Sequence, residues 1–458
     1  MLLLGFCLSL LLFFAVGMAS MRHAKKEVGD YLVAGRSVSP VAAGLSAVAS
    51  NNSGFMFIGA IGFTYAYGYA AFWLFFAWIA GDYVSWLFVH RNLRRLSEAR
   101  QTNSVAGFLA HDGDQANRGL QIFLGALTIL FLTLYAAAQL KAGGKALETM
   151  LDWPSVSGIY IGAILVLAYS FAGGIRASIW TDVVQSIVMI GAMAILILSD
   201  PIPLREIGSR LHAIDPNLLS VTPTDASLGL APYALGWFIA GAGGVGQPHM
   251  IIRAMAVKST EAIPLMRRTY FTWYVLFSVF TMLVGLYARI HLDGLEFDAE
   301  TALPILAGNH LTPVLVGVIL AAMFAATIST ADSQVLACSA STTQDVFAKL
   351  EHNHSATKMT TLAIVVAAMG VALVGPDSVF LLVTVAWGLM TTCFAPLMIA
   401  RCLGWSLSTQ SAVAACLAGT AAMLGWTHLL GLGDAMYDGA VGFVISMAIV
   451  TSASKRLP

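Results

Sequence analysis

Long apolar stretches separated by short polar segments run along the whole chain and predict a bundle of membrane-spanning helices. A helix of about 20 apolar residues crosses the roughly 30 Å of hydrocarbon in a bilayer. Stretches of suitable length lie at residues 2–20, 41–63, 69–90, 120–142, 155–173, 180–199, 228–252, 270–289, 311–340, 360–376, 379–400, 409–430 and 434–452. We therefore expect an all-α polytopic membrane protein with about 13 transmembrane helices. The stretch at 2–20 begins without basic residues, which favours a retained span over a cleaved signal peptide.

Two of these stretches contain interruptions about 190 residues apart. The first is a run of polar side chains followed by a glycine: Ser50, Asn51, Asn52, Ser53 and Gly54. The second, residues 241–248 (GAGGVGQP), holds four glycines and a proline. Such breaks are costly because hydrocarbon supplies no hydrogen-bond partners, so they are expected where freed backbone groups bind a solute or an ion. The alternatives are close helix packing through small residues and a loose kink in the bundle.

Composition and charge agree with a membrane protein and exclude other classes. Hydrophobic residues make up 58% of the chain and charged residues 10%, whereas a soluble domain carries about a quarter charged residues. The net charge is zero, which gives no electrostatic argument for a nucleic-acid partner. The chain contains no HExxH pair, nucleotide-binding loop or paired nucleophile and base, so nothing supports an enzyme. The expected partners are the lipid bilayer and a small-molecule solute.

The distribution of basic residues predicts the orientation. With the N-terminus outside, all but five of the 24 lysines and arginines fall on the cytoplasmic side, as the positive-inside rule favours. The five on the outer side are Lys141, Lys145, Arg205, Arg210 and Arg289. We therefore expect a multi-pass protein of the cell inner membrane with a cytoplasmic C-terminus.

A third polar segment lies within the stretch at 311–340. Ser329, Asp332 and Ser333 are spaced i, i+3, i+4 and share one helix face, and Ala326, Ser329 and Thr330 have the same spacing. An aspartate inside a span is expensive unless it is paired, hydrated or bound to an ion. Alternatively, the hydroxyls bond back to their own helix and Asp332 lies near cytoplasmic water.

Three further polar residues are candidates with open alternatives. Asp182 lies near the start of a predicted span and is either a site residue or a helix N-cap. Asp82 lies inside a span without an identifiable partner. Tyr135 either faces a solute or packs as an ordinary core aromatic residue.

Several motifs together resemble the sodium:solute symporter family, whose members carry proline, sugars and sialic acid. The resemblance extends from residue 27 to about residue 348. It rests on residues 30–37 (DYLVAGRS), 45–54 (LSAVASNNSG), 173–185 (GGIRASIWTDVVQ), 246–249 (GQPH) and 328–330 (IST).

This resemblance implies a five-plus-five inverted-repeat core with two discontinuous helices, working by alternating access with sodium as the coupling ion. The repeats would be residues 41–199 and 228–400, with one extra N-terminal helix at 2–20 and two extra C-terminal helices at 409–452. The family's conserved sodium site would fall on the carbonyls of Ala49, Asn52 and Ala326 and the hydroxyls of Ser329 and Thr330. A second sodium, present in some members, would fall on Asp182, Ser329, Asp332 and Ser333.

The chain is most similar to the proline-carrying branch, with departures at the expected solute site. Asn51 stands where that branch has an aspartate, and Ala240 and Gly244 stand where it has a tryptophan and a tyrosine. The two smaller residues imply a wider pocket, so we expect a small carboxylate-bearing solute, an amino acid or an organic acid, other than proline. The solute is expected to contact Asn51, Ser53, Gly54, Tyr135, Gly244 and Gln247.

Two alternatives remain open. A proton-coupled carrier of the same fold is favoured if Asp182 or Asp332 titrates. A symporter-like sensor module would bind a solute without moving it.

Overall fold

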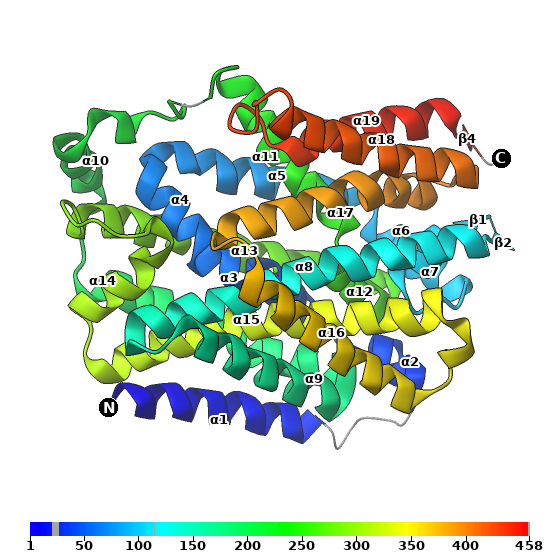
Figure 1. Cartoon of the computed structure of the whole chain (residues 1–458), viewed down its shortest axis with the longest axis horizontal. Helices are drawn as coiled ribbons and strands as arrows, with labels where there is room; N and C mark the ends of the chain where they lie inside the picture. Colours follow the sequence, from blue (N-terminus) through cyan, green and yellow to red (C-terminus); the bar gives the residue numbers. More distant parts are fainter. Residues whose placement is uncertain (21–26, 114, 225, 457–458) are drawn as a thin grey trace.

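The computed structural model describes residues 1–20, 27–113, 115–224 and 226–456, and these residues are predominantly helical (Figure 1). Most long helices run along the longest axis of the molecule, and the start of α1 (Leu2–Ser20) lies at the opposite end from β4 (Lys455–Arg456). Three of the basic residues expected on the cytoplasmic side, Arg22, Lys25 and Lys26, lie outside the described residues.

The helices and strands have the following bounds. In the first half they are α1, α2 (Val28–Val33), α3 (Pro40–Phe57), α4 (Gly59–Tyr67), α5 (Phe72–Phe88), α6 (His90–Ala99), α7 (Val105–Leu109), β1 (His111–Asp112), β2 (Gln115–Ala116), α8 (Arg118–Leu151), α9 (Ser155–Ser199) and α10 (Leu204–Ile214). In the second half they are α11 (Leu230–Ala242), α12 (Pro248–Ala256), α13 (Ile263–His291), α14 (Ala302–His310), α15 (Pro313–Ala340), α16 (His354–Val374), α17 (Val379–Cys402), β3 (Trp405–Ser406), α18 (Thr409–His428), α19 (Asp438–Ala453) and β4.

Among the described residues, eight helical segments are long and apolar enough to cross a membrane, and three shorter apolar helices accompany them. The expectation of an all-α polytopic membrane protein is confirmed, while the count of 13 spans stays a prediction.

The two spans expected at 155–173 and 180–199 are not separated by a loop. Both lie within α9, and Gly174, with φ of 59°, bends the chain between them, a conformation that glycine adopts without steric cost.

The first predicted break is present at Ser53. Helix α3 begins with Pro40 at its first position, and the Ser39 hydroxyl accepts a hydrogen bond from the Ala42 N–H. Ser53 has φ of 28° and ψ of 177°, which interrupts the helix before α4 continues the span. A non-glycine residue in this region is strained and persists only where its surroundings hold it.

The second predicted break is present between α11 and α12. A short 3₁₀ turn at Gly243–Gly246 ends α11, and Gln247 is extended with φ of −97° and ψ of 97°. Pro248 then starts α12 at a position where its missing N–H costs nothing. The prediction of two discontinuous helices is therefore confirmed.

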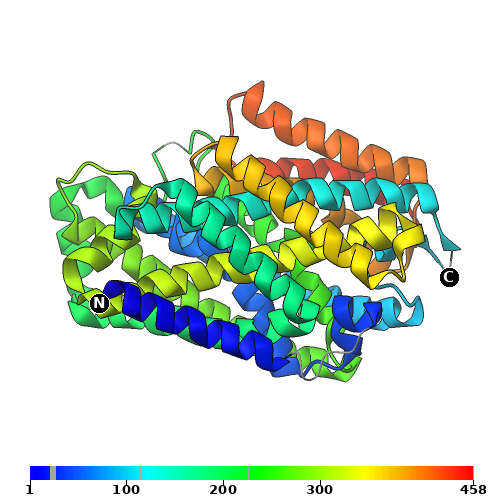
Figure 2. The ribbon, with the colours of Figure 1, turned by 60° about the horizontal axis from the view of Figure 1, so that its bottom comes forward.

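Helix α15 lies at the centre of the bundle and packs against α1, α3, α8 and α9. Figure 2 shows α1, in dark blue, and α18, in orange, lying along opposite outer faces of the bundle. Their expected role as helices outside the repeats stays a prediction. The repeat boundaries themselves stay a prediction.

Helices α5 and α11 approach closely through two glycines. A Cβ added at Gly81 would lie 1.8 Å from the Phe238 carbonyl oxygen, and one at Gly241 would lie 1.9 Å from the Trp78 carbonyl oxygen. No side chain fits at either position unless the two backbones separate.

We expect Gly81→Ala and Gly241→Ala each to lower stability by about 1–3 kcal/mol, because overpacking forces the helices apart. Thermal denaturation of the detergent-purified protein measures the effect. Gly370→Ala is the matched control, since a Cβ there meets nothing within 4 Å. That control should be neutral or slightly stabilising, because alanine is the better helix former. Equal melting temperatures for all three variants would contradict the close approach.

Candidate functional site

A small cavity lies beside the first break. Its walls include the polar side chain of Asn51 and the aromatic side chains of Phe55, Trp78, Tyr135, Tyr274 and Trp387. The volume, about 10 Å³, is close to the minimum that holds one water molecule. Binding of an organic solute here therefore requires some of these rings to move.

Two of the six expected solute contacts, Asn51 and Tyr135, line this cavity, whereas Ser53, Gly54, Gly244 and Gln247 do not. The wider pocket expected from Ala240 and Gly244 is not found. Instead, the Trp387 indole of α17 donates a hydrogen bond of 2.8 Å to the Ala240 carbonyl and covers the second break. The expectation of a wider pocket considered positions 240 and 244 alone. It did not include the Trp387 ring, because that ring comes from a different helix.

Side chains satisfy part of the backbone that the breaks expose. The Gly54 N–H donates to Gln139 Oε1 at 2.8 Å, and the Phe55 N–H donates to Ser53 Oγ at 3.1 Å. Near the second break, Gln247 Nε2 donates to the Trp387 carbonyl at 3.2 Å. These bonds hold Ser53, Gly54 and Gln247 in place behind the cavity.

Several buried polar atoms around the two breaks have no hydrogen-bond partner among the described residues. They are Asn51 Nδ2, Asn52 Nδ2 and Oδ1, Gln139 Nε2, Gln247 Oε1 and both ring nitrogens of His249. The His249 ring meets the Tyr135 ring edge-on at 5.4 Å, which brings the second break next to the central cavity. An unpaired buried polar group costs about 1–3 kcal/mol, and native proteins rarely leave several together. Their concentration here indicates a site for a polar ligand.

The five residues expected to bind sodium come from two helices that pack together. Ala49, Asn52, Ala326, Ser329 and Thr330 are all buried. The Thr330 hydroxyl donates to the Ser50 carbonyl at 3.1 Å, so it links α15 directly to α3 one turn before the break. The donor set consists of oxygen atoms, which are the ligands that a hard cation prefers.

The residues expected for a second sodium surround a guanidinium group. Arg253 is fully buried, and its Nη2 lies 3.3 Å from Asp182 Oδ2 and also donates to the Ser333 hydroxyl. The Ser329 hydroxyl donates to Asp182 Oδ1 at 2.6 Å. Asp332 accepts from the Ser170 hydroxyl at 2.5 Å.

Arg253 is the residue of this buried network that the sequence analysis missed. The orientation count placed it in a cytoplasmic loop after the span 228–252, and this placement was wrong because α12 continues to Ala256. The helix-cap alternative for Asp182 was also wrong, since Asp182 lies inside α9, eight residues after the bend at Gly174. The sequence did contain a signal that Arg253 belongs to this helix. Arg253 follows His249 by four residues, so the two share one helix face.

The partner that the sequence could not identify for Asp82 is Tyr270, whose hydroxyl donates to Asp82 Oδ2 at 2.7 Å. Asp82 lies behind the second break, where a Cβ added at Gly244 would be 3.2 Å from its Oδ1. It therefore has a neutral donor as its partner, unlike Asp182.

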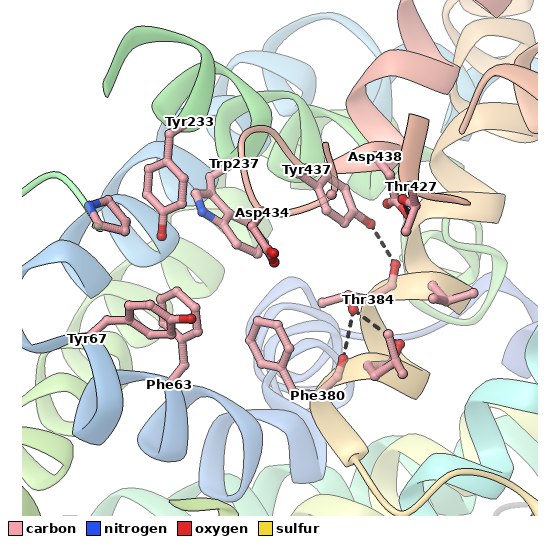
Figure 3. Close-up of a pocket in the computed structure, with 14 residues that line it drawn as sticks. Phe63, Tyr67, Tyr233, Trp237, Phe380, Thr384, Thr427, Asp434, Tyr437 and Asp438 are labelled. Carbon is pink, nitrogen blue, oxygen red and sulfur yellow. Dashed lines mark hydrogen bonds between the residues drawn. The ribbon is translucent and has the colours of Figure 1, made fainter. Parts of the chain in front are cut away.

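A larger cavity of about 260 Å³ lies on the other side of a layer of aromatic rings. Its walls include Phe63, Tyr67, Tyr233, Trp237, Phe380 and Tyr437 together with Asp434 and Asp438. In Figure 3 the Asp434 carboxylate points into the space between Trp237 and Phe380. Among the described residues that line this cavity, none is a lysine or arginine.

The aromatic layer between the two cavities consists of Phe55, Trp78, Trp237, Phe380 and Trp387. Ring centroids are 5.9 Å apart for Trp78 and Trp237, 4.9 Å for Trp78 and Trp387, and 5.3 Å for Phe55 and Phe380. Since Trp237 and Phe380 line the larger cavity and the other three line the smaller one, the layer closes the path between them.

Comparisons with known proteins agree on one family. The profile described as "SSF: Sodium:solute symporter family" matches residues 31–448. The high-affinity proline transporter PutP of Bacillus subtilis (strain 168) is 28% identical over 435 residues, covering 92% of this chain and 91% of that protein. A sodium/proline symporter of Staphylococcus aureus (strain USA300 / TCH1516) is 27% identical over 471 residues, covering 97% and 90%.

Two solved structures have the same fold. One is the substrate-bound, outward-open state of a Na⁺-coupled sialic acid symporter, with a TM-score of 0.80, 19% identity and coverage of 100% of this chain and 99% of that one. The other is MHP1, a nucleobase-cation-symport-1 family transporter in a closed conformation, with a TM-score of 0.59, 15% identity and 94% coverage of both chains.

We expect Arg253→Ala to lower stability by about 3–5 kcal/mol, because it leaves the Asp182 carboxylate buried without its counter-charge. The double variant Arg253→Ala/Asp182→Asn should lose less than the sum of the single variants. Thermal denaturation in detergent measures all three. Arg210→Ala is the control, because Arg210 pairs with Glu206 at 2.9 Å on an exposed helix, where such pairs contribute about 0–1 kcal/mol. If Arg253→Ala is no more harmful than Arg210→Ala, the buried pair is not important for stability.

Proposed function

Because this chain belongs to the sodium:solute symporter family, we propose that it imports a small carboxylate-bearing organic solute, an amino acid or an organic acid, together with sodium. The protein is a membrane transporter and not an enzyme. Uptake would proceed by alternating access between the repeats 41–199 and 228–400. The protein would lie in the cell inner membrane with its N-terminus outside.

The observation that carries this proposal is the group of orphaned polar atoms at the two breaks. A carboxylate accepts hydrogen bonds, and Asn51 Nδ2 together with a ring N–H of His249 supplies donors for it. The aromatic walls of the central cavity, above all Trp78, Tyr274 and Trp387, suit a compact apolar body. The proline-transporting relatives support an amino acid, although the residues at positions 51, 240 and 244 differ from that branch.

For sodium, the site expected from the resemblance is consistent with the contact between α3 and α15. Ala49 and Asn52 belong to α3, whereas Ala326, Ser329 and Thr330 belong to α15, so an ion bound to all five bridges the two helices. Sodium would then favour the conformation in which these helices touch, and its release toward the cytoplasm would favour their separation. A ligand shifts such an equilibrium only through different affinities for the two states.

A second sodium at Asp182, Ser329, Asp332 and Ser333 would have to share its oxygen atoms with Arg253. We therefore expect that the Arg253 guanidinium supplies the cation there and that one sodium accompanies each solute. Flux ratios in proteoliposomes measure this stoichiometry. A value above one that drops in Asp332→Ala would instead favour the second sodium.

Uptake into proteoliposomes tests the function itself. An inward sodium gradient should drive accumulation of the solute, after a thermal-shift screen of amino acids and organic acids has identified one that stabilises the protein only with sodium. Uptake driven by a proton gradient without sodium would favour the proton-coupled alternative. Binding without uptake under either gradient would favour a sensor.

We expect Thr330→Ala to raise the sodium concentration for half-maximal uptake by about tenfold or more, because loss of one ligand of a charged group costs about 1.5–3 kcal/mol. Uptake as a function of sodium concentration measures this shift. Ser339→Ala on the same helix is the matched control, since its hydroxyl bonds to the Val335 carbonyl and to Thr361, away from the site. Equal sodium dependence of the two variants would exclude Thr330 as a ligand.

A further inference from the structure

Three metal-ligating side chains meet where α9, α13 and α14 end. Asp200 follows α9, His291 is the last residue of α13, and His310 is the last residue of α14. Asp200 Oδ2 lies 3.7 Å from His291 Nε2 and 3.5 Å from His310 Nδ1, and the three ligand atoms all lie within 4.8 Å of one another. Adjacent ligands of a tetrahedral zinc ion are about 3.4 Å apart, given bond lengths of roughly 2.0–2.2 Å.

An independent observation also indicates a ligand. His291 Nε2 is buried and has no hydrogen-bond partner among the described residues. The carboxylate of Asp200, 3.7 Å away, is beyond hydrogen-bond distance, so it does not satisfy this nitrogen. A metal ion between the three side chains would satisfy it.

We propose that Asp200, His291 and His310 form a zinc-binding site. Two imidazoles and one carboxylate are a common ligand set for zinc, whereas magnesium and calcium prefer oxygen ligands alone. The side chain of Asp200 is half-exposed and those of the two histidines are partly exposed, so ions in solution reach the site and water completes the coordination. Arg210 also acts electrostatically on His291, but its guanidinium is paired with Glu206 at 2.9 Å.

The site would restrain a segment that supports the aromatic layer. Just before α14, Glu300 accepts hydrogen bonds from the Val379 N–H at 3.0 Å and the Phe380 N–H at 2.8 Å. The same segment packs against α4, because a Cβ added at Gly62 would lie 2.8 Å from the Ala299 carbonyl oxygen. A zinc ion that ties His310 to the ends of α9 and α13 therefore limits the movement of α14 and, through Glu300, of Phe380. Bound zinc should slow transport, an effect that rests on the proposed function.

Calorimetric titration of the detergent-purified full chain with zinc chloride tests the site. We expect one saturable zinc ion per chain and no binding of magnesium under the same conditions. His291→Ala, His310→Ala and Asp200→Asn should each weaken zinc binding at least tenfold, whereas His212→Ala, at an exposed histidine of α10, should bind like the wild type. No saturable zinc binding by the wild type, or unchanged binding by the three variants, would overturn the proposal.

Transport measurements in the presence of zinc distinguish a failure of the metal site from a failure of the proposed function. Zinc should reduce the initial rate of uptake several-fold in the wild type, a chelator should restore it, and His310→Ala should be insensitive. If zinc binds but leaves uptake unchanged, the restraint of the aromatic layer is excluded. If no solute is taken up at all, the proposed function fails, while the titration still decides whether the metal site exists.

Discussion

The need of every buried peptide group for a hydrogen-bond partner governs this structure more than any other constraint. Hydrocarbon supplies no partners, so a broken span is tolerated only where the protein itself supplies them. At the first break Gln139 of α8 accepts the Gly54 N–H. At the second, the Gln247 N–H bonds to the Gly244 carbonyl at 3.1 Å within the 3₁₀ turn. These bonds satisfy part of the backbone at the breaks, and several side-chain polar atoms around the breaks stay unpaired among the described residues.

Buried charges also need partners, and the ion pair of Arg253 and Asp182 meets this need. The Arg253 guanidinium contacts side chains from α3, α9 and α15: Ser46, Ser178, Asp182 and Ser333. One network therefore connects both broken helices to the central helix of the bundle. Ser329 belongs to this network and to the expected sodium ligands, since its hydroxyl donates to Asp182. Sodium at α3 and α15 would therefore compete for, or reorient, a hydroxyl that Asp182 already uses.

Sequence patterns were sufficient for the all-helical membrane fold and for both breaks, because these features follow from local properties. A polar run at residues 50–53 and four glycines in eight residues identify a break without any knowledge of the neighbouring helices. Contacts between residues that lie far apart in the sequence were not predictable in this way. Arg253 was assigned to a loop because an arginine at the edge of an apolar stretch normally reaches water, and only the fold shows that Asp182 compensates its charge. Trp387 was missed for the same reason, since it lies 147 residues from Ala240, whose carbonyl it contacts.

The aromatic layer joins the two halves of the chain through ring contacts. Phe55 and Trp78 come from the first half, whereas Trp237, Phe380 and Trp387 come from the second. A ring of one half cannot leave the layer without losing its contacts with rings of the other. The larger cavity in Figure 3, with Asp434 and Asp438 and no lysine or arginine among its described lining residues, leads to this layer. Under the proposed function, entry of a solute into the central cavity would require the halves to separate at the layer, and closure behind the solute would restore the ring contacts, as alternating access demands.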